Sequence, residues 1–352
     1  MKNIVLFLLL FPFNNLKAKG LPANTDFKTP PRIIRTCCSF GVELKLAGVP
    51  FKKYSDISSV EKLGEHKYLG NPAENNGIIY TLKGGFIDIG HLRDQADWTA
   101  YLYSVINSNI GKTVQLELGH EGGTKILDFT VPVRFSQEDR IRMAGNIAYD
   151  LSIWHEIATF YGASTVPLIP ERYSAFSMED AYSNMLGVQL GMAALHSPEP
   201  FEKAMTDLIF DKLKELKAVK HQYETAAAME LVKEDWWTDS YKLPSRNVLI
   251  KREFAVENHL TPWLVNDFTE EIIEPEVISL DVSTENGEAL DKFYRLSIKL
   301  NYKFNMNKIL PKSPTRIITQ KDFQHLIKQA EIINKEKGAK LVSALPKAYF
   351  KS

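Results

Sequence analysis

Residues 136–162, SQEDRIRMAGNIAYDLSIWHEIATFYG, contain the start, the body and the end of one predicted helix. Ser136 and Asp139 have the spacing of a capping box, which closes the first turn of a helix. Gly162 is a residue type that often ends helices, and Pro167 follows it. The many apolar residues between these signals indicate a helix that packs inside a bundle.

Other segments on both sides of this helix also have periodic patterns. Helical spacing predicts helices over 39–47, 91–106 and 178–194, and the last of them follows a second box-like start. Residues 113–118 and 125–131 alternate with period two around the turn GHEGG, which predicts an antiparallel hairpin.

The composition shifts after residue 200. The remaining chain is expected to contain one long amphipathic helix, three strands and a terminal helix, over residues 201–231, 247–254, 272–282, 294–304 and 321–337. The fold class is therefore predicted to be α+β, with a helix-rich N-terminal core, a small antiparallel hairpin and a mixed α/β C-terminal part.

The first residues have the pattern of a signal peptide. Lys2 precedes the apolar run 4–13, and Ala18 is a small residue at which cleavage is expected. No later segment is apolar for long enough to cross a membrane, so no transmembrane segment is expected after cleavage. These features predict a periplasmic or secreted protein.

The chain of 352 residues is long enough for two domains. After residues 1–18, we expect a Pro-rich leader arm over 19–31, a helix-rich catalytic domain over 32–200, and a second part over 201–352. Lys plus Arg and Asp plus Glu both number 43, so the balance of charge gives no reason to expect a nucleic-acid partner.

Two histidines and several acidic residues lie on the predicted helices. A zinc hydrolase needs three protein ligands and a carboxylate that accepts a proton from water. His155-Glu156 is half of an H-E-x-x-H motif, whose second histidine is replaced by Thr159. The hypothesis is that His91, His155 and Glu179 bind Zn or another divalent metal, and that Glu156 is the general base.

Further polar residues are candidates for support of this site or for substrate binding. Asp88 and Asp180 are placed to orient a histidine, and Asp94 shares a helix face with His91. Arg93 is expected either to bind an anionic substrate group or to pair with Asp97. The alternative for all these residues is that they only hold the helices together in a non-enzymatic envelope-binding or structural protein.

The adjacent Cys37 and Cys38 open a different possibility. Cys38 is expected at the start of a helix, where the dipole favours a thiolate. With His91 as its base, it would be the nucleophile of a thiol hydrolase of the papain-like type. Buried and inert cysteine is the ordinary alternative.

Four strings, PRIIRTCCSFG (31–41), GGFIDIGHLRDQADWTAYL (84–102), WHEIATFYG (154–162) and ERYSAFSMEDAYSNMLG (171–187), carry a resemblance. The sequence resembles a bacterial envelope family known as domain of unknown function 4056, over roughly residues 30 to 310. The resemblance implies export from a bacterial cell and brings no established activity. The leading functional expectation therefore depends on the residues themselves: a metal-dependent hydrolase that acts on an envelope component.

Overall fold

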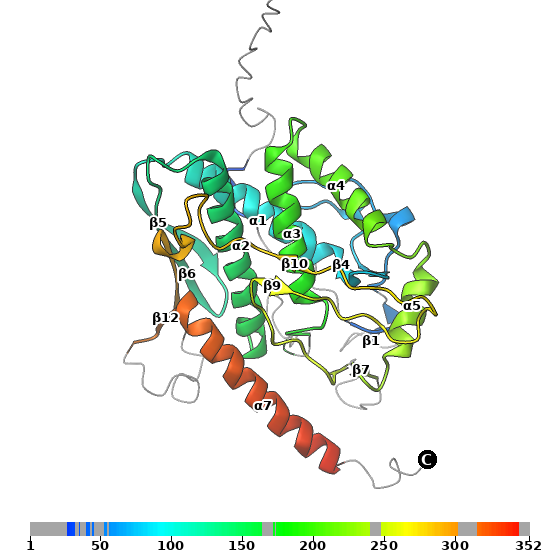
Figure 1. Ribbon diagram of the computed structural model, residues 1–352. Coiled ribbons are helices and arrows are strands. Elements are labelled where there is room, and N and C mark those ends of the chain that lie inside the picture. The colour runs from blue at the N-terminus through cyan, green and yellow to red at the C-terminus, as the bar shows by residue number, and fades with distance from the viewer. Residues whose placement is uncertain are drawn as a thin grey trace, which may run out of the picture.

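The computed structural model describes residues 27–31, 35, 40–42, 44–45, 53–54, 56–163, 172, 174–239, 248–301 and 315–344. The expected signal peptide, most of the leader arm and Cys38 lie outside these residues. The helices are α1 (Ile89–Asn107), α2 (Gln137–Phe160), α3 (Asp180–His196), α4 (Phe201–Glu215), α5 (Gln222–Leu231) and α7 (Phe323–Ala344) (Figure 1).

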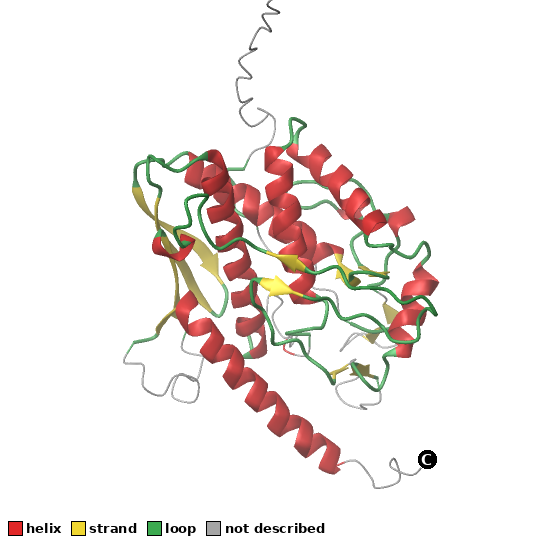
Figure 2. Ribbon diagram, viewed as in Figure 1, coloured by secondary structure: helices red, strands yellow, loops and turns green. Residues whose placement is uncertain are grey.

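The strands are short and antiparallel. They are β1 (Leu44–Lys45), β2 (Lys53–Tyr54), β3 (Ile78–Thr81), β4 (Gly85–Asp88), β5 (Thr113–His120), β6 (Gly123–Thr130), β7 (Trp237–Thr238), β8 (Val248–Leu249), β9 (His259–Leu260), β10 (Ile278–Ser279), β11 (Tyr294–Leu300) and β12 (Ile317–Thr319). Helices and antiparallel sheets occur together throughout the described residues, so the α+β class is confirmed (Figure 2).

Helices α1, α2 and α3 pack against one another at the centre of the molecule (Figure 1). Two glycines of α3 allow close approach to α1: a Cβ on Gly187 would lie 2.1 Å from the carbonyl oxygen of Leu92, and one on Gly191 would lie 2.9 Å from Cα of Ala96. Because residue numbers rise together along both helices, α1 and α3 run parallel. Their N-termini therefore lie at the same end of the bundle.

The predicted hairpin is confirmed as β5 and β6, and it belongs to a larger sheet. The strand order is β12-β11-β6-β5, and Leu127 of β6 lies opposite Leu296 of β11. Both leucines are fully buried and join the core that α2 also enters. The sheet therefore holds the hairpin against the side of the helix bundle.

Two predicted helices are wrong. Leu44–Lys45, inside the helix expected over 39–47, form a strand that pairs with Lys53–Tyr54. The long helix expected over 201–231 is interrupted between α4 and α5, where Lys217 takes a left-handed φ of 55° and Val219 donates a hydrogen bond to the carbonyl of Tyr80. Pairing of this segment with β3 satisfies backbone groups that a continuous helix would have satisfied internally.

The main hydrophobic core contains residues from Phe27 to Ala330, so segments on both sides of residue 200 contribute to one core. Of the expected strands 247–254 and 272–282, only the two-residue pieces β8 and β10 form. In the part of the chain that the structure describes, no helix combines the length and the apolar character that crossing a membrane requires.

Candidate functional site

The N-terminus of α1 fixes the first histidine. Asp88 is the N-cap residue, and its Oδ1 accepts hydrogen bonds from the backbone N–H groups of Gly90 and His91. The other carboxylate oxygen of Asp88 lies 3.0 Å from Nδ1 of His91. The sequence forms a helix start here because an Asp satisfies N–H groups that have no partner within the helix.

A second carboxylate reaches the same imidazole from α3. Oδ1 of Asp180 lies 3.2 Å from Nδ1 of His91, while its Oδ2 accepts a hydrogen bond from the N–H of Ser177. The Oγ of Ser183 accepts a hydrogen bond from the backbone N–H of Asp88, which ties the two helix starts together. Two carboxylates beside Nδ1 favour a proton on that nitrogen, so the lone pair of the neutral ring is on Nε2.

His155, near the C-terminus of α2, is held in a similar way by the hairpin. Its Nδ1 lies 2.5 Å from Oε1 of Glu121, and the other carboxylate oxygen of Glu121 lies 3.0 Å from Nζ of Lys125. Burial raises the pKa of Glu121, but the charges of Lys125 and His155 outweigh this effect and lower the pKa to about 2. Glu121 is therefore ionised, and it favours the His155 tautomer with its lone pair on Nε2.

The structure brings His91, His155 and Glu156 together. One potential ligand atom from each of the three residues lies within 4.8 Å of the other two, and the imidazole centroids are 6.1 Å apart. Oε2 of Glu156 accepts a hydrogen bond of 2.6 Å from the N–H of Phe176, a residue with a left-handed φ of 56°. This unusual backbone conformation is of the kind found where a site must be held in one geometry.

A basic side chain lies close to this acidic group. Nη1 of Arg252 donates to the carbonyl of Ala175, and Nη2 donates to the carbonyl of Arg172. Burial lowers the pKa of Arg252 to about 10, and the negative charges of Glu156 and Asp180 oppose that change. Arg252 thus stays cationic and offsets part of the negative charge of the site.

Among the described residues, two groups could hold a metal ion: the one just described, and a second that consists of Asp88, His91 and Asp180. Glu179 belongs to neither group. Its Oε2 accepts a hydrogen bond from the Oγ of Ser177, and its side chain lines a small pocket beside the site. Burial raises the pKa of Glu179 to about 8, although the Ser177 hydrogen bond opposes this.

Asp94 and Arg93 lie one turn farther along α1, in a buried ionic cluster. Arg35 donates hydrogen bonds to Glu74, Asp94 and Asp97. Burial raises the pKa of Asp94 to about 7, against the charge of Arg35. Arg93 is fully buried and donates to the carbonyls of Gly64 and Glu74.

Arg93 was expected to bind substrate or to pair with Asp97. The Asp97 carboxylate instead contacts Arg35 at 2.9 Å and His66 at 3.0 Å. Arg93 is buried, and its guanidinium donates to loop carbonyls. These contacts are those of a residue that holds the loop to α1. This cluster joins α1 to the loop before β3. It thereby stabilises the first turns of α1, which carry His91.

Two residues of the site did not stand out in the sequence. Glu121 lies in the hairpin turn between two segments of alternating polarity, and Arg252 lies in a segment that was expected to be a strand. No local pattern distinguishes them from solvent-exposed charges. Only the folded structure shows that they lie beside the helices.

The geometry defines a polar site at one end of a three-helix bundle, with two carboxylate-supported imidazoles. A family model described as a protein of unknown function (DUF4056) matches residues 25–266, which include every residue of this site. The chain belongs to that family. No curated protein and no solved structure matches the chain.

Proposed function

We propose that this protein is a metal-dependent hydrolase in which His91, His155 and Glu156 bind one divalent cation such as Zn²⁺. The observation that carries the proposal is the 4.8 Å grouping of their ligand atoms, in which Nδ1 of each imidazole is in contact with a carboxylate. Two histidines and one glutamate form the ligand set of a known class of zinc hydrolases.

The carboxylates that contact Nδ1 of the two imidazoles support this assignment. Histidine ligands generally donate their second N–H to a carboxylate or carbonyl, which fixes the ring and increases its basicity. Glu121 has this relation to His155, and Asp88 and Asp180 have it to His91. A histidine that only fills a core needs one carbonyl acceptor, so three carboxylates on two rings favour a ligand role.

The charge of the site also favours a cation. When ionised, Asp88, Asp180, Glu121 and Glu156 contribute four negative charges, and Lys125 and Arg252 offset two of them. A divalent ion would neutralise the remainder.

A bound divalent ion supplies a water molecule of lowered pKa and polarises a substrate carbonyl. The chain's own residues hold the ligand rings in place and keep most solvent out, since His91 and Glu156 are only 8% and 3% exposed. We infer that the substrate is a component of the bacterial envelope, and that the protein works in the periplasm or outside the cell after removal of residues 1–18. The location rests on the signal-peptide pattern, and the substrate class rests on the resemblance to the envelope family.

Metal binding by the full chain tests the proposal. The purified protein is stripped with a chelator, titrated with ZnCl₂ in competition with a chromophoric chelator, and analysed for bound metal. We expect one equivalent of Zn²⁺ per chain, and a loss of at least about tenfold in affinity for His91→Ala, His155→Ala and Glu156→Gln. His120→Ala is the matched control, because this histidine is exposed at the hairpin tip and should leave the affinity unchanged.

The absence of stoichiometric binding in the folded wild type, or equal affinity in all four variants, would overturn the metal site. Cys38 lies outside the described residues, so the thiol hydrolase stays a prediction of the sequence. Rapid alkylation of Cys38 at neutral pH, together with no metal binding, would favour it. Negative results in both assays would favour a non-enzymatic envelope protein.

A further inference from the structure

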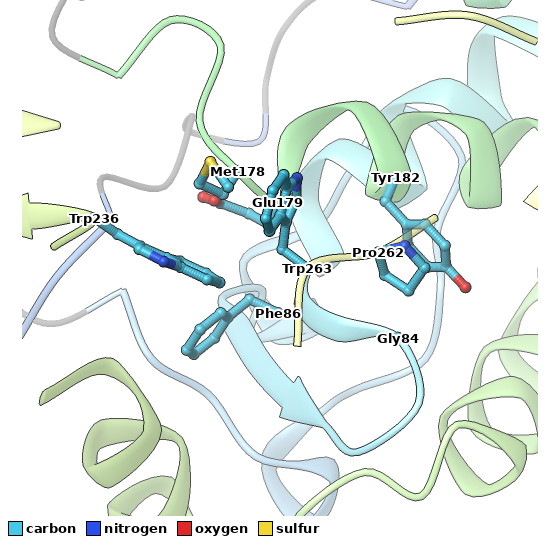
Figure 3. Close-up of a pocket in the computed structure, with 8 residues that line it drawn as sticks. All are labelled: Gly84, Phe86, Met178, Glu179, Tyr182, Trp236, Pro262 and Trp263. Atoms are coloured by element: carbon cyan, nitrogen blue, oxygen red, sulfur yellow. The ribbon is translucent and has the colours of Figure 1, made fainter. Parts of the chain in front are cut away.

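A polar hollow opens at the surface between the loop before β3 and the start of α5. Its volume of about 350 Å³ lies in the lower part of the range for ligand pockets, roughly 300–1,000 Å³. The residues that line it are Ile57, Ser58, Lys62, Asn75, Asn76 and Gln222. The hollow beside Glu179 differs, because the rings of Phe86, Trp236 and Trp263 leave no space there for a water molecule (Figure 3). A ligand therefore has room in the polar hollow.

Contacts within the protein hold the walls of the polar hollow. Ile57 pairs with Ile78 in an isolated parallel bridge. Gly77 allows this close approach, since a Cβ on it would lie 2.5 Å from the carbonyl oxygen of Asp56. From the start of α5, Nε2 of Gln222 donates a hydrogen bond of 2.6 Å to the carbonyl of Ile57. The hollow is therefore formed without a ligand, and binding does not have to order its walls.

Side-chain amides and one hydroxyl provide most of the polar lining. Nδ2 of Asn75 donates to the carbonyl of Ala73, and the Oγ of Ser58 donates to the carbonyl of Asn75. After these contacts Asn75 keeps one N–H donor and its acceptor oxygen, and the Ser58 oxygen still accepts. A sugar hydroxyl both donates and accepts, so a lining that combines free donors with free acceptors suits a carbohydrate.

Lys62 gives the polar hollow a positive charge. Its Nζ donates a hydrogen bond of 2.6 Å to Oε1 of Gln222, which is a neutral group. Among the residues that the structure describes, no carboxylate forms an ion pair with Lys62, and none lines the hollow. The ammonium group keeps two N–H donors after its bond to Gln222, so it favours a ligand that brings a carboxylate.

An exposed pair of rings lies beside the polar hollow. His221 and Tyr223 flank Gln222 in the chain, their rings are stacked with centroids 5.3 Å apart, and Tyr223 is 70% exposed. His221 also contacts Glu61, the neighbour of Lys62, at 3.7 Å. The C–H bonds of a sugar ring are weakly positive and pack against the negative face of an aromatic ring. The rings thus add a surface for a sugar next to the groups that suit its hydroxyls.

We propose that the polar hollow binds an acidic sugar, whose hydroxyl groups contact the amides of Asn75 and Gln222 and whose carboxylate contacts Lys62. The lining shares no residue with the proposed metal site. Binding of the sugar does not depend on the metal, so the two proposals can fail separately.

Three small probes test the hydroxyls and the charge on the full chain, at constant ionic strength. Methyl β-D-glucuronide carries both features, methyl β-D-glucoside lacks the carboxylate, and cyclohexanecarboxylate lacks the hydroxyls. Binding is measured by isothermal titration calorimetry and saturation-transfer NMR, with a chelator present so that no carboxylate binds through a metal. We expect the glucuronide to bind about threefold or more tightly than either other probe, as one exposed ion pair allows. Undetectable binding of the glucuronide, or binding no tighter than that of either other probe, would overturn the proposal.

Two variants and a control locate the site. Lys62→Met should reduce the affinity for the glucuronide to that for the glucoside, and leave the glucoside unchanged. Asn75→Gly should weaken both sugars about threefold, because an amide that bonds hydroxyls is lost. Lys335→Met, at a lysine on α7 whose side chain is 73% exposed, should have no effect.

Both variants should keep the fold. Lys62 and Asn75 are exposed, and the left-handed φ of 49° at Asn75 is one that glycine adopts readily. Unchanged glucuronide binding in either variant would contradict the assignment.

Discussion

Oε1 of Glu121 lies 2.5 Å from Nδ1 of His155, and this contact joins the turn of the β5–β6 hairpin to the last turns of α2. The indole N–H of Trp154 also donates to the backbone carbonyl of Glu121, so two adjacent residues of α2 hold the same hairpin residue. The hairpin therefore has a direct role in orienting a proposed metal ligand.

Glu121→Gln should reduce the affinity for Zn²⁺ by about 10- to 100-fold, because the neutral amide makes the His155 ring a weaker donor. Competition titration with a chromophoric chelator measures the change. Glu117→Gln, at a neighbouring residue with an exposed side chain, is the control and should behave as the wild type. Unchanged affinity in a folded Glu121→Gln would show that this contact does not serve a metal.

Gly187→Ala should destabilise the protein by about 2 kcal/mol or more, even though alanine is the better helix former. The added Cβ would lie 2.1 Å from the carbonyl oxygen of Leu92, and backbone on a packed helix cannot move aside easily. Gly145→Ala is the matched control in α2. Its Cβ first meets the flexible end of Met192, so we expect a much smaller change in the urea midpoint.

The central helices and the hairpin could be predicted because their signals are local. Ser136 and Asp139 form both hydrogen bonds of the expected capping box, and alternation marked the two strands of the hairpin. The pairing of β6 with β11 had no such signal, since Leu127 and Leu296 lie far apart in the chain. The break after α4 was missed because it depends on pairing with β3, which a helical pattern does not reveal.

The site shows the same division between local and long-range information. His91, His155 and Glu156 could be selected from the sequence because they combine imidazole and carboxylate groups on predicted helices. Glu121 could not, since the turn GHEGG contains both His120, whose side chain is 73% exposed, and Glu121, whose side chain is 10% exposed. Which of two neighbouring turn residues points inward is decided by docking of the hairpin on α2.

Glu74 should stabilise the fold at neutral pH and lose this effect in acid. Burial raises the pKa of Glu74, but the hydrogen bonds and charge of Arg35 outweigh it and lower the pKa to about 2. A lowered pKa stabilises the native state above the unfolded value of 4.5, and the contribution disappears as pH falls from there towards 2.

We therefore expect Glu74→Gln to lower the free energy of unfolding by about 3 kcal/mol at pH 7, and by progressively less below pH 4.5. Urea unfolding at several pH values measures this difference. Glu65→Gln, whose side chain is 75% exposed, should be neutral at every pH. A pH-independent loss in Glu74→Gln would mean that packing, and not the charge, is responsible.

Asp150 should show the opposite pH dependence. Burial raises the pKa of Asp150 from 3.8 to about 7, although the hydroxyl of Tyr294 donates a hydrogen bond of 2.8 Å to its Oδ2 and opposes the rise. Between these two pH values the native state binds a proton that the unfolded chain has lost. The free energy of unfolding therefore falls as pH rises from about 4 to 7, because ionisation of this half-buried carboxyl costs free energy in the native state.

Asp150→Asn removes this ionisation and keeps a carbonyl oxygen that can accept from Tyr294. We expect the variant to match the wild type near pH 4 and to be more stable by about 4 kcal/mol at pH 8. Thermal and urea unfolding across this range measure the difference, and Asp211→Asn, at an exposed position of α4, should change nothing. If Asp150→Asn were less stable than the wild type at pH 8, the carboxylate would have to be a favourable native charge, in contradiction to its raised pKa.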